Sequence, residues 1–179
     1  ASLNYNPFSS TALTGVVGAL YEPLFYMNNL KDDPTKLEPL MGKSYTISDD
    51  AKTIDVTIRD GEKWSDGEPY TAEDVAYTFN LLNSNKALNT GGFAGSAEVL
   101  SDTEVRITLD KPESVNALSY LSGTMIVPKH VWEKIDDPVT YTNKDAVGSG
   151  PFTVKGGNFS PTAYTFKKNP YYWDEGKPE

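Results

Sequence analysis

The stretch Ile58–Leu82, IRDGEKWSDGEPYTAEDVAYTFNLL, decides the fold of this chain. It starts at the end of a β-strand and passes through two Asp-Gly pairs, Asp60-Gly61 and Asp66-Gly67. Asp-Gly pairs supply the positive-φ positions that reverse a chain at little steric cost. The segment is therefore predicted to form a double turn, with Trp64 exposed between the two reversals.

A helix is predicted to begin after Thr71. The Thr71 hydroxyl can accept a hydrogen bond from the backbone of Asp74, and the Asp74 carboxylate can reach back, which makes a capping box with Asp in place of the usual Glu. Glu73 and Asp74 lie in the first turn, where the helix dipole favours negative charge. The apolar residues recur at helical spacing and form one stripe for burial: Ala72, Val75, Ala76, Phe79 and Leu82.

Two β-hairpins are predicted on either side of this helix. The first joins residues 43–48 to residues 53–59, and the second joins residues 97–100 to residues 104–110. Apolar and polar residues alternate in the second strand of each hairpin, which is the pattern of a sheet with one face buried and the other exposed to solvent. Residues 37–147 are therefore predicted to form a small α+β unit.

The rest of the chain is expected to hold shorter elements, because glycine and proline interrupt its apolar runs. These are a helix near 11–21, a buried strand near 24–27, a loop over 83–95, a helix over 114–121, a buried strand over 125–128 and a helical turn from Lys129.

The composition excludes several classes of function. The 179 residues include 25 acidic and 16 basic ones, a net charge of −9, so nucleic acid and anionic membrane surfaces are poor partners. The absence of cysteine excludes disulfides, thiol nucleophiles and cysteine-ligated metals, and leaves the compartment undecided. No apolar run reaches the roughly 18 residues of a membrane span. No signal peptide begins the chain, so we expect either a cytoplasmic protein or one whose export signal has been removed.

No metal or cofactor site is predicted. His130 is the only histidine, so it has no histidine partner for a metal, and we interpret it as a surface or helix-end residue. Asp136, Asp137 and Asp145 match no calcium-loop spacing. The glycine-rich residues 90–95 lack the ending of a phosphate-binding loop.

The pattern D-G-x-x-W-S-D-G-x-P-x-T-A-E-D-V-x-x-T-F, starting at Asp60, resembles the signature region of the family 5 extracellular solute-binding proteins, the peptide-, nickel- and oligosaccharide-binding receptors of ABC importers. Further blocks are similar to the family and follow its order. They are Asn6-Pro7-Phe8 with YEPLF at 21–25, IVPKHVWEK at 126–134, and GSGPF at 148–152 with KNPYYW at 168–173.

The resemblance implies an α+β chain that forms the N-terminal part of a type II periplasmic-binding-protein fold of cluster C type, with an inserted small α+β subdomain. Residues 1–36 and 148–179 are then first-lobe segments that line the ligand cleft, residues 37–147 are the inserted subdomain, and the second lobe lies outside this chain.

The same resemblance implies five candidate ligand-binding residues on the cleft wall. Glu22 is the strongest of them, because a carboxylate in an apolar run must be paired, hydrated or facing a cleft. The five candidates are Asn6, Phe8, Glu22, Leu24 and Tyr26.

The implied function is capture of an extracellular oligopeptide or dipeptide and its delivery to a membrane permease, with no catalysis and no cofactor. The implied location is periplasmic or extracellular, as a lipoprotein whose anchor is not in this chain. An oligosaccharide is the main rival ligand, because aromatic rings serve sugars and peptide side chains alike. Two other classes stay open. One is a glycoside hydrolase using two carboxylates among Asp66, Glu73 and Asp74, and the other is a stand-alone interaction module.

Overall fold

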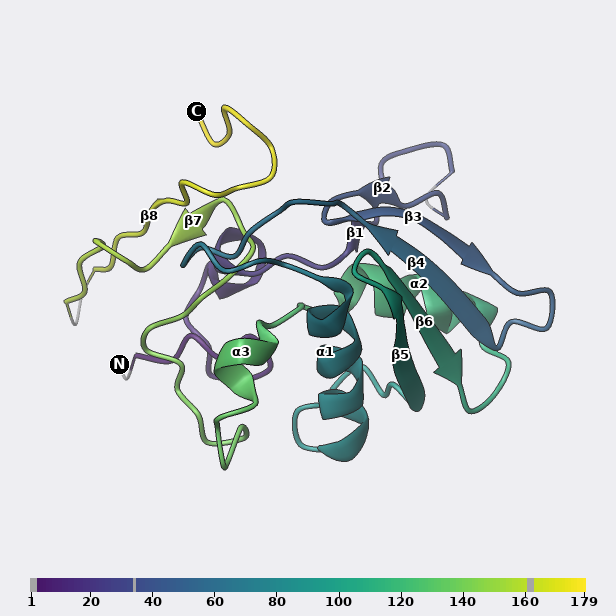
Figure 1. Cartoon of the computed structure of the whole chain (residues 1–179). Helices are drawn as coiled ribbons and strands as arrows, with labels where there is room; N and C mark the ends of the chain where they lie inside the picture. The colour runs from purple at the N-terminus through teal and green to yellow at the C-terminus, as the bar shows by residue number, and fades with distance from the viewer. Residues whose placement is uncertain (1–2, 34, 161–162) are drawn as a thin grey trace.

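The centre of the molecule is a four-stranded antiparallel sheet, seen in a computed structural model that describes residues 3–33, 35–160 and 163–179. The strand order is β3-β4-β6-β5 (Figure 1). The bounds are β3 Gly42–Ile47, β4 Thr53–Ile58, β5 Gly95–Ser101 and β6 Glu104–Leu109. Both predicted hairpins are confirmed, and the central pair of strands places Ile54 opposite Ile107 and Val56 opposite Val105.

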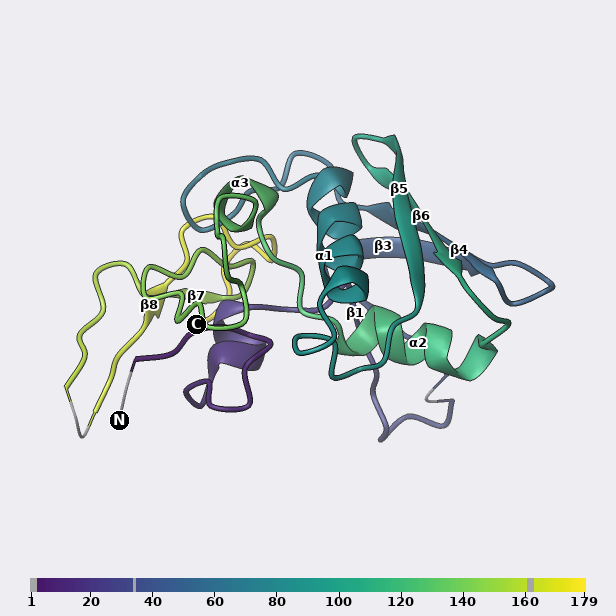
Figure 2. The same ribbon diagram turned by 90° about the horizontal axis from the view of Figure 1, so that it is seen from below.

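Helix α1, Ala72–Ser84, packs on this sheet, and all five residues of its predicted apolar stripe are buried. The predicted capping box is present, because the Asp74 carboxylate accepts the backbone N–H of Thr71 at 2.9 Å. The Thr71 hydroxyl accepts the N–H of Glu73 at 3.3 Å. Figures 1 and 2 show α1 running beside β5, the outermost strand on that side.

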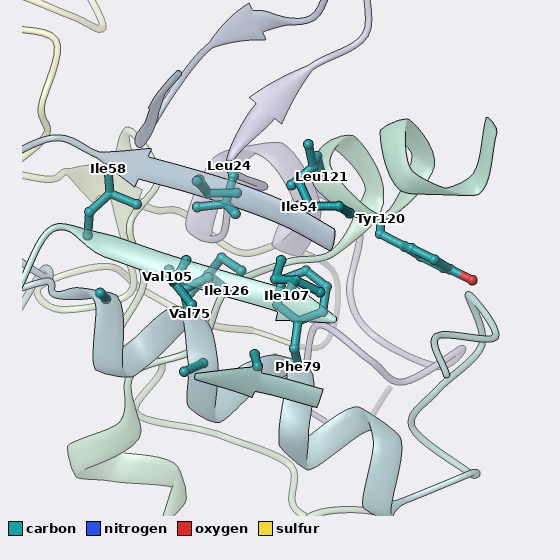
Figure 3. Close-up of a cluster of buried hydrophobic side chains, with 14 of the residues drawn as sticks. Leu24, Ile54, Ile58, Val75, Phe79, Val105, Ile107, Tyr120, Leu121 and Ile126 are labelled. Carbon is teal, nitrogen blue, oxygen red and sulfur yellow. The ribbon is translucent and has the colours of Figure 1, made fainter. Parts of the chain in front are cut away.

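Apolar side chains from both central strands, α1 and α2 (Ser114–Gly123) converge in one core (Figure 3). Phe79 meets Phe93 edge to face with ring centroids 4.9 Å apart, and Phe93 meets Tyr120 at 5.4 Å. Burying one such ring stabilises the fold by roughly 1.5–3 kcal/mol. The predicted loop over 83–95 is therefore attached to the core at Phe93, whose side chain is buried.

Trp64 is fully buried, so the prediction that it is exposed is wrong. Its indole Nε1 donates to Asp74 Oδ2 at 3.1 Å, and its ring lies 4.6 Å from that of Tyr70. The double turn folds back over the start of α1 and places this ring in the main hydrophobic core, which the turn pattern alone does not reveal.

The remaining elements are short. They are the π-helical turn η1 (Val16–Leu20), β1 (Phe25–Tyr26) paired with β2 (Glu38–Pro39), α3 (Lys129–Trp132), and β7 (Phe152–Thr153) paired with β8 (Lys167–Lys168). The helix predicted over 11–21 is wrong in extent. Gly15 and Gly18 take φ values of +88° and +86°, which are left-handed and stop a regular helix on both sides of Val16.

The strand predicted over residues 125–128 is also wrong, although the segment is extended and buried at Met125, Ile126 and Val127. Its backbone bonds two different neighbours instead of one strand. Ile126 N–H donates to the carbonyl of Glu22 at 3.4 Å, and Val127 N–H donates to the Thr78 hydroxyl at 3.1 Å. The predicted helical turn after Pro128 is confirmed as α3.

Candidate functional site

Glu22 lies where the first and last motif blocks meet. Its side chain is buried, with 8% of the residue exposed. One carboxylate oxygen accepts the hydroxyl of Tyr172 at 2.8 Å, and the other accepts the indole Nε1 of Trp173 at 3.2 Å. Residues 150 positions apart in the chain are therefore joined through one carboxylate.

Burial raises the pKa of Glu22, and the hydrogen bonds from Tyr172 and Trp173 oppose part of that rise. Burial and the neighbouring Glu22 charge in turn raise the pKa of Tyr172. The tyrosine therefore stays protonated and serves as a donor, which is the role that an ionised carboxylate needs from it.

Arg59 completes this arrangement. Its guanidinium lies over the Trp173 ring, 4.0 Å from the centroid, and its Nε donates to the carbonyl of Leu40 at 2.6 Å. A cation held over an aromatic face is attractive. We call Glu22, Arg59, Tyr172 and Trp173 the Glu22 cluster. It ties the end of the sheet region to the C-terminal block of the chain.

At Gly148 and Gly150 the backbone passes directly against the backbone of η1. Gly150 N–H donates to the carbonyl of Leu20 at 2.9 Å, and Gly148 exchanges hydrogen bonds with Ser65 through both its N–H and its carbonyl. A Cβ at Gly148 would collide with the Leu20 carbonyl oxygen, and a Cβ at Gly150 with that of Ala19. Only glycine allows the two backbones to pass so closely.

Like Glu22, two more of the five predicted binding residues are buried. Asn6 is fully buried, and its amide donates to the carbonyls of Pro138 at 3.0 Å and Tyr141 at 2.9 Å. Leu24 is fully buried in the core of the sheet. Both residues hold the N-terminal segment in place in this structure.

Phe8 and Tyr26 lie nearer the surface. Phe8 packs edge to face on Trp132, with centroids 5.5 Å apart, beside a small cavity of about 160 Å³. Tyr26, on β1, is 52% exposed. The structure does not bring the five candidates to one cavity, and their role in ligand binding stays a prediction.

A larger cavity of about 440 Å³ lies between the N-terminal segment, the Asp66 turn, residues 144–147 and the loop after β7. This volume is within the usual range of small-molecule sites. None of the five candidates lines it. Its walls carry acidic, basic and aromatic side chains. They include Tyr5, Asp66, Lys144, Asp145, Lys155 and Phe159. Sequence reasoning weighed Asp66 and Asp145 for other roles and missed the other four, because they come from segments without periodicity or motif.

The three acids of the hydrolase alternative are all engaged in structural contacts. Asp66 Oδ2 lies 2.8 Å from His130 Nε2, which ties α3 to the double turn. Glu73 pairs with Lys129 at 2.8 Å. Asp74 is buried, and burial raises its pKa against the hydrogen bonds from Thr71, Lys129 and Trp64. Within the described ranges, no group of three His, Cys, Asp or Glu side chains could hold a metal.

Comparison with known proteins identifies the family. The family model of the bacterial extracellular solute-binding proteins, family 5 (middle), matches residues 36–179. The chain belongs to this family. Family 5 members are solute-binding proteins of ABC importers, and the resemblance of the signature stretch is thereby confirmed.

The relatives are much longer than this chain. The peptidoglycan-binding protein YepA of Agrobacterium fabrum is 30% identical over 191 residues, which cover 97% of this chain and 30% of that protein. The dipeptide-binding protein DppE of Bacillus subtilis is 27% identical over 195 residues, covering 94% and 35%. The chain therefore spans about a third of the length of these relatives.

The fold matches solved family members. The periplasmic oligopeptide-binding protein of an oligopeptide ABC transporter from Thermotoga maritima aligns with a TM-score of 0.84 and 30% identity, over 96% of this chain and 32% of that one. A second crystal structure of that protein, with mannohexaose bound, aligns with a TM-score of 0.83 and 29% identity, over the same shares of the two chains. The predicted α+β fold of a type II periplasmic binding protein is confirmed.

The family to which this chain belongs is extracellular or periplasmic. None of the helices in the described residues is both long enough and apolar enough to cross a bilayer. The predicted domain boundaries at residues 36, 147 and 148 stay a prediction.

Proposed function

We propose that this chain is part of a receptor that captures an oligopeptide outside the cytoplasm and delivers it, unaltered, to the membrane permease of an ABC importer. The observation that carries this proposal is the alignment of 96% of the chain with an oligopeptide-binding transport protein at a TM-score of 0.84. In a two-lobed receptor the ligand shifts the population from an open to a closed form, because its contacts are divided between the lobes. Attachment to the cell envelope through a lipid anchor is part of the proposal.

The Glu22 cluster gives this chain a role in that receptor. It fixes the segment from Glu22 to Tyr26 against Arg59 and Trp173, so that a first-lobe wall is ordered before ligand arrives. A preorganised wall lowers the entropic cost of binding. Tyr26, at the exposed end of this segment, is the most exposed of the five candidates.

An oligosaccharide is the second candidate ligand, since the Thermotoga relative has been crystallised with mannohexaose. The tryptophans of this chain give no support to sugar stacking. Trp64 and Trp132 are buried, and Arg59 lies over the ring of Trp173. Sugar rings stack best on exposed aromatic faces, and the most exposed rings among the described residues are those of the tyrosines Tyr26 and Tyr171.

The test is ligand-induced thermal stabilisation of the native protein that carries this chain, with trialanine and mannohexaose as probes. We expect the melting temperature to rise with trialanine, because a ligand that binds only the folded state stabilises it. A rise with mannohexaose alone would contradict the peptide assignment, and no rise with a broad set of peptides and sugars would contradict capture itself.

A hydrolysis assay on the same samples separates the receptor from the glycosidase alternative. We expect both probes to be recovered intact, and Asp66→Asn to leave that result unchanged. The isolated 179-residue chain is expected to bind trialanine weakly or not at all, because a two-lobed receptor divides its contacts. A calorimetric affinity equal to that of the native protein would show that this chain holds the whole site.

A further inference from the structure

Strand β5 forms one edge of the four-stranded sheet, and α1 runs beside it (Figure 2). Two asparagine side chains of α1 form hydrogen bonds with this edge. An edge strand presents unpaired backbone N–H and C=O groups, which are a template for pairing with another chain. The side chain of Asn80 forms hydrogen bonds with both the backbone N–H and the backbone C=O of Ala97, which point away from β6. Its Oδ1 accepts the Ala97 N–H at 2.9 Å, and its Nδ2 donates to the Ala97 carbonyl at 2.9 Å.

These two bonds have the pattern of strand pairing. In an antiparallel ladder, opposite residues of a hydrogen-bonded pair exchange both an N–H and a C=O bond. The Asn80 carboxamide, although it belongs to a helix, donates one hydrogen bond to Ala97 and accepts one from it, as an opposite strand residue would. One turn further along α1, Asn83 Oδ1 accepts the N–H of Gly95 at 3.4 Å, two residues before Ala97 on the same side of the strand.

The rest of this edge is short and open. Ala97 lies opposite Ile107 of β6, and Val99, two residues further along, lies opposite Val105. Backbone groups alternate in direction along a strand, so the N–H and C=O of Val99 point away from β6, as those of Ala97 do. Val99 is 43% exposed, and a shift in register between Val99 and Ser101 ends the regular edge. A shallow hollow of about 390 Å³ lies over Tyr77, Asn80, Ala97 and Val99, so the edge beside the amide is open to an incoming strand.

We propose that the Asn80 carboxamide acts as a surrogate strand that closes the β5 edge against pairing with β5 of a second copy of this chain. A symmetric antiparallel pair centred on Ala97 would place Val99 opposite Gly95 and Glu98 opposite Ser96, so it brings no like charges face to face. Two-fold pairing of this kind is self-complementary. Asn80 blocks it at the central residue.

The proposal is tested with Asn80→Ala in the native protein that carries this chain, with Asn116→Ala as the matched control. Asn116 is an exposed asparagine on α2 whose amide donates to the Glu113 carboxylate at 3.2 Å. Alanine is a better helix former than asparagine, so neither change weakens its helix. Sedimentation velocity over a range of concentrations should show the control as a monomer and Asn80→Ala shifting to a dimer as concentration rises. An Asn80→Ala protein that stays monomeric over the same range would overturn the proposal.

A second variant locates the interface. Proline at position 97 has no N–H to offer to an incoming strand, and the inner ladder does not use that group. Asn80→Ala combined with Ala97→Pro should therefore return to a monomer, while a dimer that persists would place the contact elsewhere and overturn the proposal. Hydrogen exchange of the Asn80→Ala protein gives the same answer without a second mutation. The amides of Ala97 and Val99 should gain protection as concentration rises, and unchanged protection would contradict β5 pairing.

Discussion

Glu22 shows how far residue-level reasoning reaches. A carboxylate between a tyrosine and a proline in an apolar run had to be paired, hydrated or facing a cleft, and the structure shows it paired with Tyr172 and Trp173. The need for partners could be predicted from the sequence. Their identity could not, because they lie at the far end of the chain and no local pattern links them to Glu22.

The hydroxyl of Tyr172 should carry a measurable share of the stability. A hydrogen bond to a charged group contributes about 1.5–3 kcal/mol, so we expect Tyr172→Phe to lower the free energy of unfolding by about 2 kcal/mol. Tyr171→Phe is the control, because Tyr171 is 42% exposed and, among the described residues, its hydroxyl has no hydrogen-bond partner. A surface change of this kind should stay within about 0.5 kcal/mol. Urea unfolding measures both, and equal effects would contradict the pairing.

Glu22 should also leave a signature in the pH dependence of stability. Burial raises its pKa in the folded state above the ordinary value of a glutamate. A raised folded pKa contributes stability that is fully present below the unfolded pKa and is lost as the pH rises through the folded pKa. Glu22→Gln stays neutral throughout, while the other carboxylates are common to both proteins.

The measured quantity is the free energy of unfolding of the wild-type chain minus that of Glu22→Gln. We expect this difference to fall as the pH rises from about 4 towards about 7, because only the wild-type chain then buries a charge. Urea unfolding across that pH series gives the difference directly. A difference that stays flat, or grows with pH, would show that Glu22 is not held in a buried site.

At the level of elements, the sequence was most informative where one side of an element faces the core. Alternation predicted β4 and β6, and the apolar stripe with its capping box predicted α1. The failures have different causes: positive-φ glycines shorten the helix predicted over 11–21, and the other two come from packing that no periodicity in the sequence reveals. Trp64 is buried by folding back on Asp74 and Tyr70, and residues 125–128 bond a helix side chain and a loop instead of a strand.

The glycine crossing at η1 gives a sharp prediction at this scale. Gly148→Ala places a Cβ against the Leu20 carbonyl oxygen, and overpacking against a backbone that cannot yield costs about 1–3 kcal/mol or more. Gly123→Ala is the control, because a Cβ at Gly123, the last residue of α2, meets nothing within 4 Å. We expect the control to be neutral or slightly stabilising in thermal unfolding. A Gly148→Ala protein as stable as the control would show that the two backbones do not pass as closely as described.

At the scale of the whole molecule, the helix-and-sheet region and the terminal segments are held together by a few non-local contacts. The Glu22 cluster and the Gly148 crossing join them, and Asp66 with His130 ties α3 to the double turn. The family and its fold could be predicted from motif blocks in the right order. The cavity beside Tyr5 and Lys155 could not, because its walls come from loops that only the folded chain brings together.

Capture of peptide without chemical change is the central claim, and native mass spectrometry of the protein that carries this chain, purified gently from its host, tests it most directly. We predict a bound species that dissociates on activation with the mass of an oligopeptide and the fragmentation pattern of peptide bonds. A retained glycan, or a ligand recovered as hydrolysis products, would contradict the account.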